Sequence, residues 1–356
     1  MTNKQCMGCG VQLQDLHKTE IGYTPSLEQD YCQRCFRLTH YDDITLYVKQ
    51  GESDPHVYEQ IRNMDCLVVW VVDLFDFEGS LIAGLARHIG NKDVLLVGTK
   101  RDLLPTTLSD QKLGRWLQGR LKQEEIKVRG IVVTASHGRD GIDHVREAIS
   151  QLSKGRSIVF MGTANVGKST LLNALLQQTG ITTSRYPGTT IDMVKLESAF
   201  GTLYDTPGVM RKDNIVHYLD LKEIKNVIPQ KTVKPKNYQL YEPQTLSIGG
   251  MVRIDFPAGI PTTVTCYFHD LIPIHRGKYE RADGLWEKHY GELLAPVTTA
   301  AASFAEFQRY DISLEGTDKV DIMIHGLGWV CIASAKQRIA VYVPKQIGIT
   351  KTRARV

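Results

Sequence analysis

The sequence predicts three regions: a small cysteine-containing module, an α/β domain built on a parallel sheet, and a C-terminal domain made mostly of β-strands. Three observations lead to this prediction. Two C-x₂-C pairs lie near the N-terminus, a strand, a glycine-containing loop and a helix follow one another at 157–178, and strand-like runs separated by Gly and Pro fill much of the last third of the chain. We place the three regions at residues 1–45, 46–210 and 211–356.

Length and composition agree with this division. The 356 residues are 42% hydrophobic and 23% charged, with a net charge of only +4. These values are ordinary for a globular protein of two or three domains. The longest apolar run, Cys66–Val72, is strand-sized and far shorter than the ~18 residues of a membrane-spanning helix. We therefore expect no membrane association.

Residues 162–169, Gly-Thr-Ala-Asn-Val-Gly-Lys-Ser, match the phosphate-binding loop G-x-x-x-x-G-K-[ST]. The glycines let backbone N–H groups surround a polyphosphate, Lys168 reaches the outer phosphates, and the Ser169 hydroxyl ligates Mg²⁺. An apolar strand-like run precedes the loop, and a run of helix formers with leucines at helical spacing follows it. The predicted phosphate cradle is Gly162, Thr163, Ala164, Asn165, Val166, Gly167, Lys168, Ser169 and Thr170.

Two segments downstream complete the phosphate site. Arg185–Thr190 supplies the hydroxyls of Thr189 and Thr190, and Thr190 can close over the γ-phosphate and its Mg²⁺. Leu203-Tyr-Asp-Thr-Pro-Gly208 ends a strand with Asp205, which is placed to hold the water shell of the metal. The N–H of Gly208 can sense the γ-phosphate.

The element that reads the base lies upstream of the phosphate loop. A strand at 94–98 is followed by Thr99-Lys-Arg-Asp102. The Asp102 carboxylate can accept from the N1–H and the N2 amino group of guanine, while the Lys100 stem covers the ring. Adenine offers neither donor, so GTP is expected rather than ATP. A second strand at 131–133 leads into a loop that can contact the base from its backbone: Thr134, Ala135 and Ser136.

This order, with base-reading loops first, phosphate loop second and switches third, is that of a circularly permuted P-loop GTPase domain. The chain resembles YqeH-type circularly permuted GTPases over nearly its whole length, including the cysteine pairs and the β-rich tail. The resemblance implies a GTP/GDP switch that assists assembly of the small (30S) ribosomal subunit in the bacterial cytoplasm; we expect a monomer. The first residue of the base-reading motif is usually Asn and here is Thr99, which has no side-chain amide to brace the neighbouring loop.

The permutation also changes where the switch leads. In an unpermuted domain, Gly208 would continue through a switch helix into the strand that lies here at 64–73. The chain instead runs from Gly208 directly into residues 211–356. We therefore predict that loss of the γ-phosphate repositions the C-terminal domain.

Two residues bear on hydrolysis. Val209 stands where many GTPases have the glutamine that orients the attacking water, so unaided hydrolysis should be slow. In GTPases similar to this one, an Asn at the position of Asn165 helps hold K⁺ between the α- and γ-phosphates. Asn165 can alternatively be a loop residue that tolerates an unusual backbone angle.

Four cysteines have the spacing of a structural zinc site. Cys6-Met-Gly-Cys9 and Cys32-Gln-Arg-Cys35 are two close pairs with 22 residues between Cys9 and Cys32. Four thiolates so arranged suit tetrahedral Zn²⁺ in a Cys₄ zinc finger. A disulfide fits less well without a signal peptide, and a redox C-x₂-C would need a βαβ context. The remaining cysteines lie in apolar runs and are expected in the core: Cys66, Cys266 and Cys331.

The C-terminal region combines basic clusters with strand-like runs. Residues 211–356 carry a net charge of about +5, so the rest of the chain is near neutral. We predict an antiparallel β domain with one helix near 284–294 and strands at 244–256, 262–274, 319–324, 328–333 and 338–343. The basic residues form two groups: Lys222, Lys225, Lys231, Lys234 and Lys236, and then Lys345, Lys351, Arg353 and Arg355.

Aromatic side chains among these strands allow two interpretations. They can stack on RNA bases while the lysines neutralise phosphates, or they can form the core while the lysines are merely solvated. We predict contact with the small ribosomal subunit or its rRNA; the alternative is a protein or peptide partner. The aromatics concerned are Tyr267, Phe268, Tyr279 and Trp329.

Overall fold

The computed structural model describes residue 4 and residues 12–16, 23–30, 55–135, 139–178, 193–198, 201–316, 318–333 and 336–355. Several predicted site residues lie outside these ranges: Cys6, Cys9, Cys32, Cys35, Ser136, Thr189 and Thr190. In the N-terminal module, Gln14 and Tyr23 form an isolated parallel bridge. None of the described helices is both long and apolar enough to cross a membrane.

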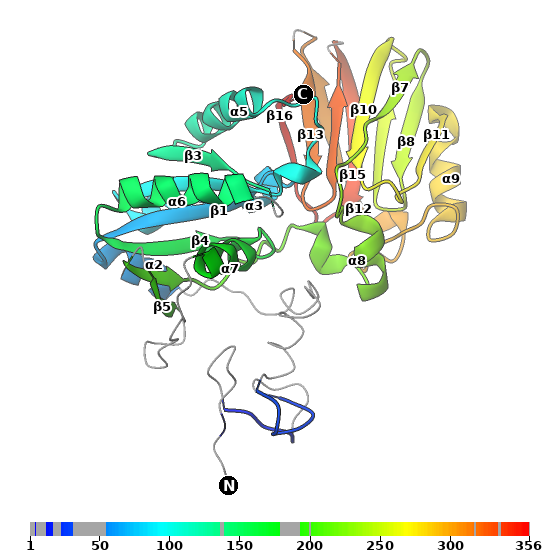
Figure 1. Cartoon of the computed structure of the whole chain (residues 1–356). Helices are drawn as coiled ribbons and strands as arrows, with labels where there is room; N and C mark the ends of the chain where they lie inside the picture. The colour runs from blue at the N-terminus through cyan, green and yellow to red at the C-terminus, as the bar shows by residue number, and fades with distance from the viewer. Residues whose placement is uncertain are drawn as a thin grey trace.

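The first large domain is an α/β sandwich around a six-stranded sheet of order β3-β2-β1-β4-β6-β5 (Figure 1). The strands are parallel except β5, which runs antiparallel to β6. Every residue of β1 is buried, as expected for a central parallel strand covered by helices on both faces. The strands are β1 Cys66–Asp73, β2 Asp93–Thr99, β3 Gly130–Val133, β4 Ser157–Gly162, β5 Val194–Ser198 and β6 Gly201–Asp205.

Short and long helices alternate with these strands. Only short helical segments follow β1 and β2: α3 and α4 after β1, and the turn η2 after β2. The longer helices α5, α6 and α7 supply the apolar faces that cover the sheet. The helices are α2 Pro55–Asn63, α3 Phe77–Ser80, α4 Leu85–Ile89, the 3₁₀ turn η2 Arg101–Leu103, α5 Asp110–Gln123, α6 Arg139–Ser153 and α7 Lys168–Gln178.

The sheet confirms the permuted order of the domain. Although β1 comes first in the chain, it lies at the centre, paired with β2 on one side and with β4 on the other. The carboxyl ends of β1, β2, β3, β4 and β6 therefore meet at one edge of the sheet, where ligands of such folds bind. That edge brings the base-reading loops, the phosphate loop and the segment after Asp205 together.

The C-terminal domain consists of two five-stranded antiparallel sheets, β16-β13-β14-β10-β7 and β11-β8-β9-β15-β12, with a shared apolar core. A connecting segment with η3 Ile215–Tyr218 and α8 Leu221–Val227 leads into it, and α9 Ala282–His289 packs on its outer side (Figure 1). The strands are β7 Lys236–Leu240, β8 Gln244–Ile248, β9 Val252–Phe256, β10 Thr262–Phe268, β11 Ile274–Lys278, β12 Phe307–Leu314, β13 Val320–Ile324, β14 Gly328–Ile332, β15 Gln337–Pro344 and β16 Ile349–Arg353.

The predicted antiparallel β domain is present, but several of its boundaries were wrong. The run 244–256 is divided between β8 and β9, the run 262–274 forms β10 only as far as Phe268 and reaches β11 with its last residue, and the helix lies at 282–289 rather than 284–294. The sequence also gave no sign of β7, β12 and β16. All three are edge strands of their sheets, and most of their residues are exposed or half-buried, so they contain no continuous apolar run.

The two large domains share one hydrophobic cluster. Trp329 of β14 stacks on Tyr267 with ring centroids 4.6 Å apart and meets the edge of Phe75, which follows β1, at 5.5 Å. The Arg355 guanidinium lies 4.4 Å from the Trp329 ring centroid and 4.6 Å from that of Trp116 on α5. A rigid-body displacement of the C-terminal domain must therefore expose these side chains.

This interface decides between the two interpretations of the aromatic side chains and corrects the prediction for Arg355. Tyr267, Phe268 and Trp329 are buried, so they offer no stacking surface for RNA, and the interpretation of these three rings as core residues is correct. Arg355 is buried as well, with its Nε 3.4 Å from Asp321, and does not belong to a basic surface. As predicted, Cys66, Cys266 and Cys331 are buried, and burial raises the pKa of the Cys266 thiol to about 12.

Candidate functional site

The phosphate loop has the backbone shape that a polyphosphate cradle requires. Asn165 and Gly167 both adopt positive φ, +65° and +84°, and α7 begins at Lys168. A Cβ added at Gly162 would lie 2.5 Å from the Val71 carbonyl oxygen, so only glycine fits there. The left-handed conformation of Asn165 agrees with its interpretation as a turn residue, and it leaves the K⁺ hypothesis untested.

The segment after β6 pairs directly with the phosphate loop. The Ala164 N–H donates to the Val209 carbonyl at 2.9 Å, and the Val209 N–H donates to the Gly162 carbonyl at 3.0 Å. Gly208 lies so close that an added Cβ would be 3.1 Å from Ala164 Cα. A displacement of Gly208 is therefore transmitted to the loop by two hydrogen bonds and by packing.

Lys168 and Asp205 meet at the centre of the phosphate site. The Lys168 ammonium, which is 9% exposed, contacts the Asp205 carboxylate and donates to the Thr206 carbonyl at 2.6 Å. Phosphate oxygens would compete with Asp205 for this ammonium and so release the carboxylate toward Mg²⁺. With Ser169 in the first turn of α7, the residues present fit a magnesium nucleotide.

The base-reading loop is held by the two neighbouring strands. The Arg101 N–H donates to the Thr134 carbonyl at 3.2 Å, and the Thr134 N–H donates to the Gly98 carbonyl at 2.7 Å. The loop after β3, which includes Ala135, is thereby joined to the loop after β2, as the sequence predicted. Lys100 adopts a left-handed conformation with φ of +57°, and Asp102 lies in the turn η2 that follows.

Thr99 does brace the neighbouring loop, although it lacks an amide. Its hydroxyl lies 2.5 Å from the Val166 carbonyl oxygen of the phosphate loop and 3.0 Å from the Val72 carbonyl oxygen of β1. From the sequence, such a brace is expected only of a side-chain amide. A buried hydroxyl at the end of β2 reaches the same loop, because β2 and β4 flank β1.

Asp73 is a site residue that the sequence argument missed. It ends β1, and its Oδ2 lies 2.7 Å from the Lys100 ammonium, while its Oδ1 accepts from the N–H groups of Phe75 and Asp76 at 2.8 and 3.3 Å. This pairing orients the lysine expected to cover the guanine ring. A carboxylate at the end of a fully apolar strand was the available signal.

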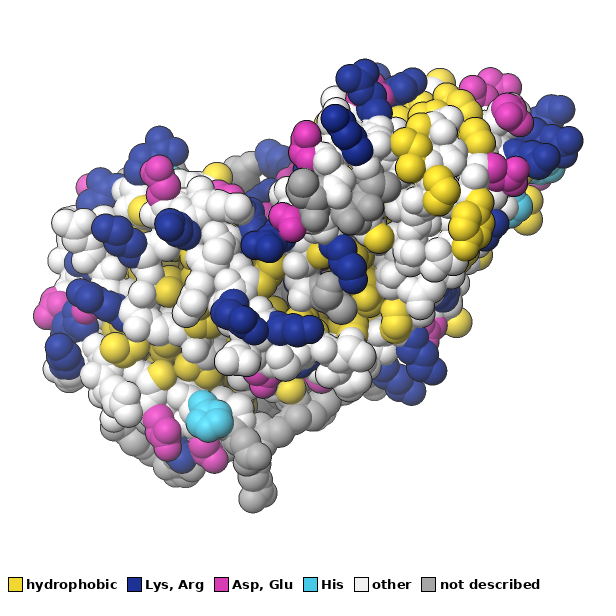
Figure 2. Space-filling model, turned by 90° about the horizontal axis from the view of Figure 1, so that it is seen from above, with side chains coloured by type: hydrophobic (Ala, Val, Ile, Leu, Met, Phe, Trp, Pro, Cys, Tyr) yellow, Lys and Arg dark blue, Asp and Glu magenta, His cyan; other side chains and the backbone are white. Residues whose placement is uncertain are grey.

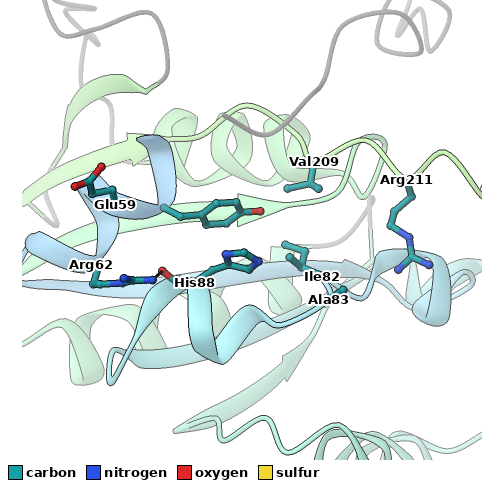
Figure 3. A pocket seen from close by; sticks show the side chains of 8 residues that line it. Glu59, Arg62, Ile82, Ala83, His88, Val209 and Arg211 are labelled. Carbon is teal, nitrogen blue, oxygen red and sulfur yellow. Dashed lines mark hydrogen bonds between the residues drawn. The ribbon is translucent and has the colours of Figure 1, made fainter. Parts of the chain in front are cut away.

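A cavity of about 550 Å³ lies beside the switch segment (Figure 3). Val209 and Arg211 line one side of it, and α2, α4 and the residues before α4 line the other. The rings of Tyr58 and His88 stack with centroids 4.4 Å apart. Because α2 directly precedes β1, it stands where an unpermuted chain would continue after Gly208, and it now meets Val209 without a covalent connection.

Most of the metal ligands predicted from the sequence lie outside the described residues. The described part of the chain contains no group of three or more His, Cys, Asp or Glu that could hold a metal ion. The four cysteines of the predicted zinc finger lie outside that part, as do Thr189 and Thr190, so those assignments remain predictions.

Comparison with known proteins agrees with this geometry. The family described as "YqeH-like, C-terminal" matches residues 261–354, and "50S ribosome-binding GTPase" matches residues 157–247. "Uncharacterized protein YqeH" of Bacillus subtilis (strain 168) is 37% identical over 355 residues, 97% of each chain. "NO-associated protein 1, chloroplastic/mitochondrial" of Arabidopsis thaliana is 30% identical, covering 92% of this chain and 69% of that protein. The crystal structure of YjeQ from Thermotoga maritima matches 40% of this chain and 47% of that chain, at 26% identity and a TM-score of 0.28.

The extent of these matches fits the permuted order. The GTPase family match starts at residue 157, the first residue of the phosphate-loop strand β4, and leaves out the base-reading strands upstream. The B. subtilis relative, in contrast, aligns over the whole arrangement of permuted domain and C-terminal sandwich. The chain therefore belongs to the YqeH family of circularly permuted GTPases, and it binds and hydrolyses GTP.

Proposed function

We propose that this GTPase is a nucleotide-dependent assembly factor that binds a ribosomal particle, specifically the small subunit or its rRNA, through a basic linker formed by residues 211–236. The observation that carries the proposal is the charge of this linker. Its 26 residues contain seven Lys and Arg and three Asp and Glu, so its net charge equals the +4 of the whole chain. A compact excess of positive charge attracts a phosphate backbone.

The linker touches both ends of the nucleotide site. It follows Val209, which pairs with the phosphate loop, and at its far end Val233 donates to the Leu103 carbonyl beside the base-reading turn. Five of its lysines are exposed, whereas Lys236 is partly buried and donates to the carbonyls of Asp270 and Ile272. The exposed lysines are Lys212, Lys222, Lys225, Lys231 and Lys234.

Within this proposal, the nucleotide site has assigned roles. Asp102 reads guanine, Ser169 and Thr190 ligate Mg²⁺, and Asn165 holds an activating K⁺. Because Val209 offers no group to orient water, unaided hydrolysis is slow. Zn²⁺ on the four N-terminal cysteines supports the first module.

The role of K⁺ is tested by replacing K⁺ with Na⁺. This should lower the hydrolysis rate of the wild type and leave the rate of Asn165→Ala nearly unchanged. Equal wild-type rates in both salts contradict the K⁺ role.

Binding to purified 30S and 50S subunits tests the main proposal, with sedimentation measured in GTP, in GDP and over a series of salt concentrations. We expect tighter binding to 30S, a dependence on nucleotide, and weaker binding at higher salt. Changing four of the exposed linker lysines, Lys222, Lys225, Lys231 and Lys234, to Gln should reduce both the affinity and the salt slope. A charge-matched control changes four exposed lysines elsewhere in the C-terminal domain to Gln: Lys278, Lys288, Lys319 and Lys345.

Two outcomes would contradict the proposal. Equal binding of the two variants means that the linker is not the contact, and preferential binding to 50S means that the particle is the other subunit. The location of the chain in the cell also stays a prediction, because one relative is named as chloroplastic/mitochondrial.

A protein partner is the second candidate, and one observation favours it. Figure 2 shows hydrophobic side chains gathered on the surface of the C-terminal domain, next to both basic and acidic ones. In the part of that domain that the structure describes, the exposed large hydrophobic residues include Tyr241, 68% exposed, and Leu271, 64% exposed. Binding to subunits that is insensitive to salt but lost in Tyr241→Ser would favour a protein contact.

A further inference from the structure

The basic linker crosses the base-reading turn and hydrogen-bonds to it twice. The Thr232 hydroxyl donates to the Asp102 carbonyl at 2.7 Å, and the Val233 N–H donates to the Leu103 carbonyl at 2.9 Å. Val233 is itself buried in the cluster shared by the two domains. The turn that carries the guanine-reading carboxylate is therefore attached to the C-terminal domain.

These two bonds satisfy groups that the turn leaves open. Within η2, the Lys100 carbonyl accepts from Leu103 N–H at 3.1 Å and the Arg101 carbonyl accepts from Leu104 N–H at 3.2 Å. The next two carbonyls, those of Asp102 and Leu103, lie beyond the last bond of this turn, as at any helix C-terminus. The linker supplies their donors, so it fixes the peptide groups on the C-terminal side of the Asp102 side chain.

The fixed backbone matters because Asp102 must face two donors of guanine at once. A carboxylate that accepts from N1–H and from the N2 amino group needs a defined orientation as well as a defined position. The start of the turn is held from the other side, by Thr134 at the Arg101 N–H and by Asp73 at the Lys100 ammonium. Thr232 and Val233 hold its end.

We propose that Thr232 is a positioning residue for guanine recognition, so that the linker to the C-terminal domain supplies part of the base specificity of the GTPase site. The inference rests on the assignment of Asp102 as the guanine-reading residue. It also gives the linker a second route of coupling, at the base, in addition to the route through Gly208 at the γ-phosphate. The coupling is reciprocal: if a ligand that stabilises this linker conformation raises the affinity for guanine nucleotide by some factor, the nucleotide raises the affinity for that ligand by the same factor.

The test compares GDP with IDP, whose base lacks the exocyclic amino group. In full-length protein, Thr232→Val removes the donor at nearly constant size and should weaken GDP binding about threefold to tenfold, the effect of one lost hydrogen bond. IDP should lose less, so the GDP/IDP affinity ratio falls. Thr232→Ser, which retains the donor, should restore the ratio.

A matched control is Thr265→Val on β10, whose exposed hydroxyl donates to the Asn237 side chain at 2.8 Å, away from the base-reading turn. It should leave both affinities unchanged. Amide exchange of the wild type gives a readout that does not depend on a variant: GDP should slow exchange of the Val233 N–H more than IDP does.

Three outcomes would overturn the inference. They are an equal loss of GDP and IDP affinity in Thr232→Val, an unchanged GDP affinity in that variant, and an exchange rate of the wild-type Val233 N–H that is the same with GDP and with IDP. Asp102→Asn separates this failure from failure of the underlying assignment. If Asp102→Asn abolishes guanine preference while Thr232→Val leaves the ratio unchanged, only the role of Thr232 falls. If Asp102→Asn leaves guanine preference intact, both the assignment of Asp102 as the guanine-reading residue and the role of Thr232 are wrong.

Discussion

The two ends of the nucleotide site are built in different ways. At the phosphate end, residues of one loop, 162–169, and of the strand end next to it provide the shape and the charge. At the base end, the reading turn is held by Asp73, Thr134 and Thr232, which lie in three different segments of the chain. One contiguous motif can bind a phosphate group, because its own backbone groups are the main contacts. Recognition of a base edge requires a precisely oriented side chain, whose backbone is held by several segments of the chain.

Thr99 is the point where the two ends meet. Its hydroxyl reaches the Val166 carbonyl of the phosphate loop, while its own carbonyl accepts from the Leu74 N–H at 3.1 Å. Leu74 in turn accepts from Arg355 of the C-terminal domain at 3.1 Å. The base end is thus connected both to the phosphate loop and to the other domain, so perturbations there should spread further than perturbations at the phosphate end.

The largest expected effect on nucleotide binding is at the phosphate end and should be confined to it. Lys168→Ala removes the ammonium that meets the phosphates, which should weaken GTP and GDP binding by roughly 100-fold or more, since a hydrogen bond between charged groups is lost. Calorimetry measures the affinities, and thermal unfolding of the nucleotide-free protein serves as the control. A large loss of stability without nucleotide would show that the Lys168–Asp205 contact is structural.

The next effect tests the connection between the base end and the C-terminal domain. Arg355 and Asp321 are both fully buried, so Arg355→Ala leaves a buried carboxylate without its cation and should cost about 3–5 kcal/mol of stability. Burial raises the pKa of Asp321. Chemical denaturation measures the loss, and the control is Arg353→Ala, whose side chain is 77% exposed and should matter by less than ~0.5 kcal/mol. Equal effects of the two variants would show that the interface does not depend on this pair.

The same comparison explains what the sequence could predict. The phosphate loop, the Asp205–Gly208 segment and the permuted order were predictable because each is a short motif whose chemistry requires neighbouring residues. Thr232 and Arg355 were not, because their partners Asp102 and Leu74 lie 130 and 281 residues away in the chain. Nothing in the local sequence around Thr232 distinguishes it from any other linker threonine.

The aromatic residues show a second limit of sequence reasoning. Trp329 and Tyr267 lie in strands with no sign of which face is covered, and the sequence alone left open whether they were core residues or a surface for RNA. The answer depends on the position of Phe75 and Trp116, which belong to the other domain. Contacts between domains depend on three-dimensional packing. They produce no periodic pattern of apolar residues in the sequence, so they could not be predicted from it.

A smaller effect is expected where the two ends meet. Thr99→Val keeps the size of the side chain but removes the hydroxyl that reaches the Val166 carbonyl, so nucleotide affinity should fall about threefold to tenfold. Because the phosphate loop is displaced rather than Asp102, GDP and IDP should lose affinity equally. Calorimetry with both nucleotides measures this. A change in the GDP/IDP affinity ratio would mean that Thr99, like Thr232, acts on the base-reading turn rather than on the phosphate loop alone.

The smallest effect concerns the start of the linker, at the phosphate end. Burial raises the pKa of Asp213, but hydrogen bonds with Arg211 at 2.6 and 2.8 Å and contact with His325 at 2.9 Å outweigh burial and hold that pKa well below its usual range. A carboxylate with a lowered pKa stabilises the fold above about pH 4, and this contribution is lost as the pH falls further. Asp213→Asn should therefore cost about 1 kcal/mol at pH 7, because the pair is partly exposed.

The difference between wild type and Asp213→Asn should shrink as the pH is lowered from 5 to 3 in denaturation measured at each pH, since the Asp213 carboxylate is then protonated in the unfolded chain while Arg211 and His325 keep it ionised in the fold. Arg211 also donates to the Leu81 carbonyl at 2.6 Å, a contact that Asp213→Asn leaves in place, so the linker should stay attached to the GTPase domain. GDP affinity should accordingly remain unchanged at pH 7. A loss of GDP affinity in this variant would show that the phosphate end, like the base end, depends on how the linker is held.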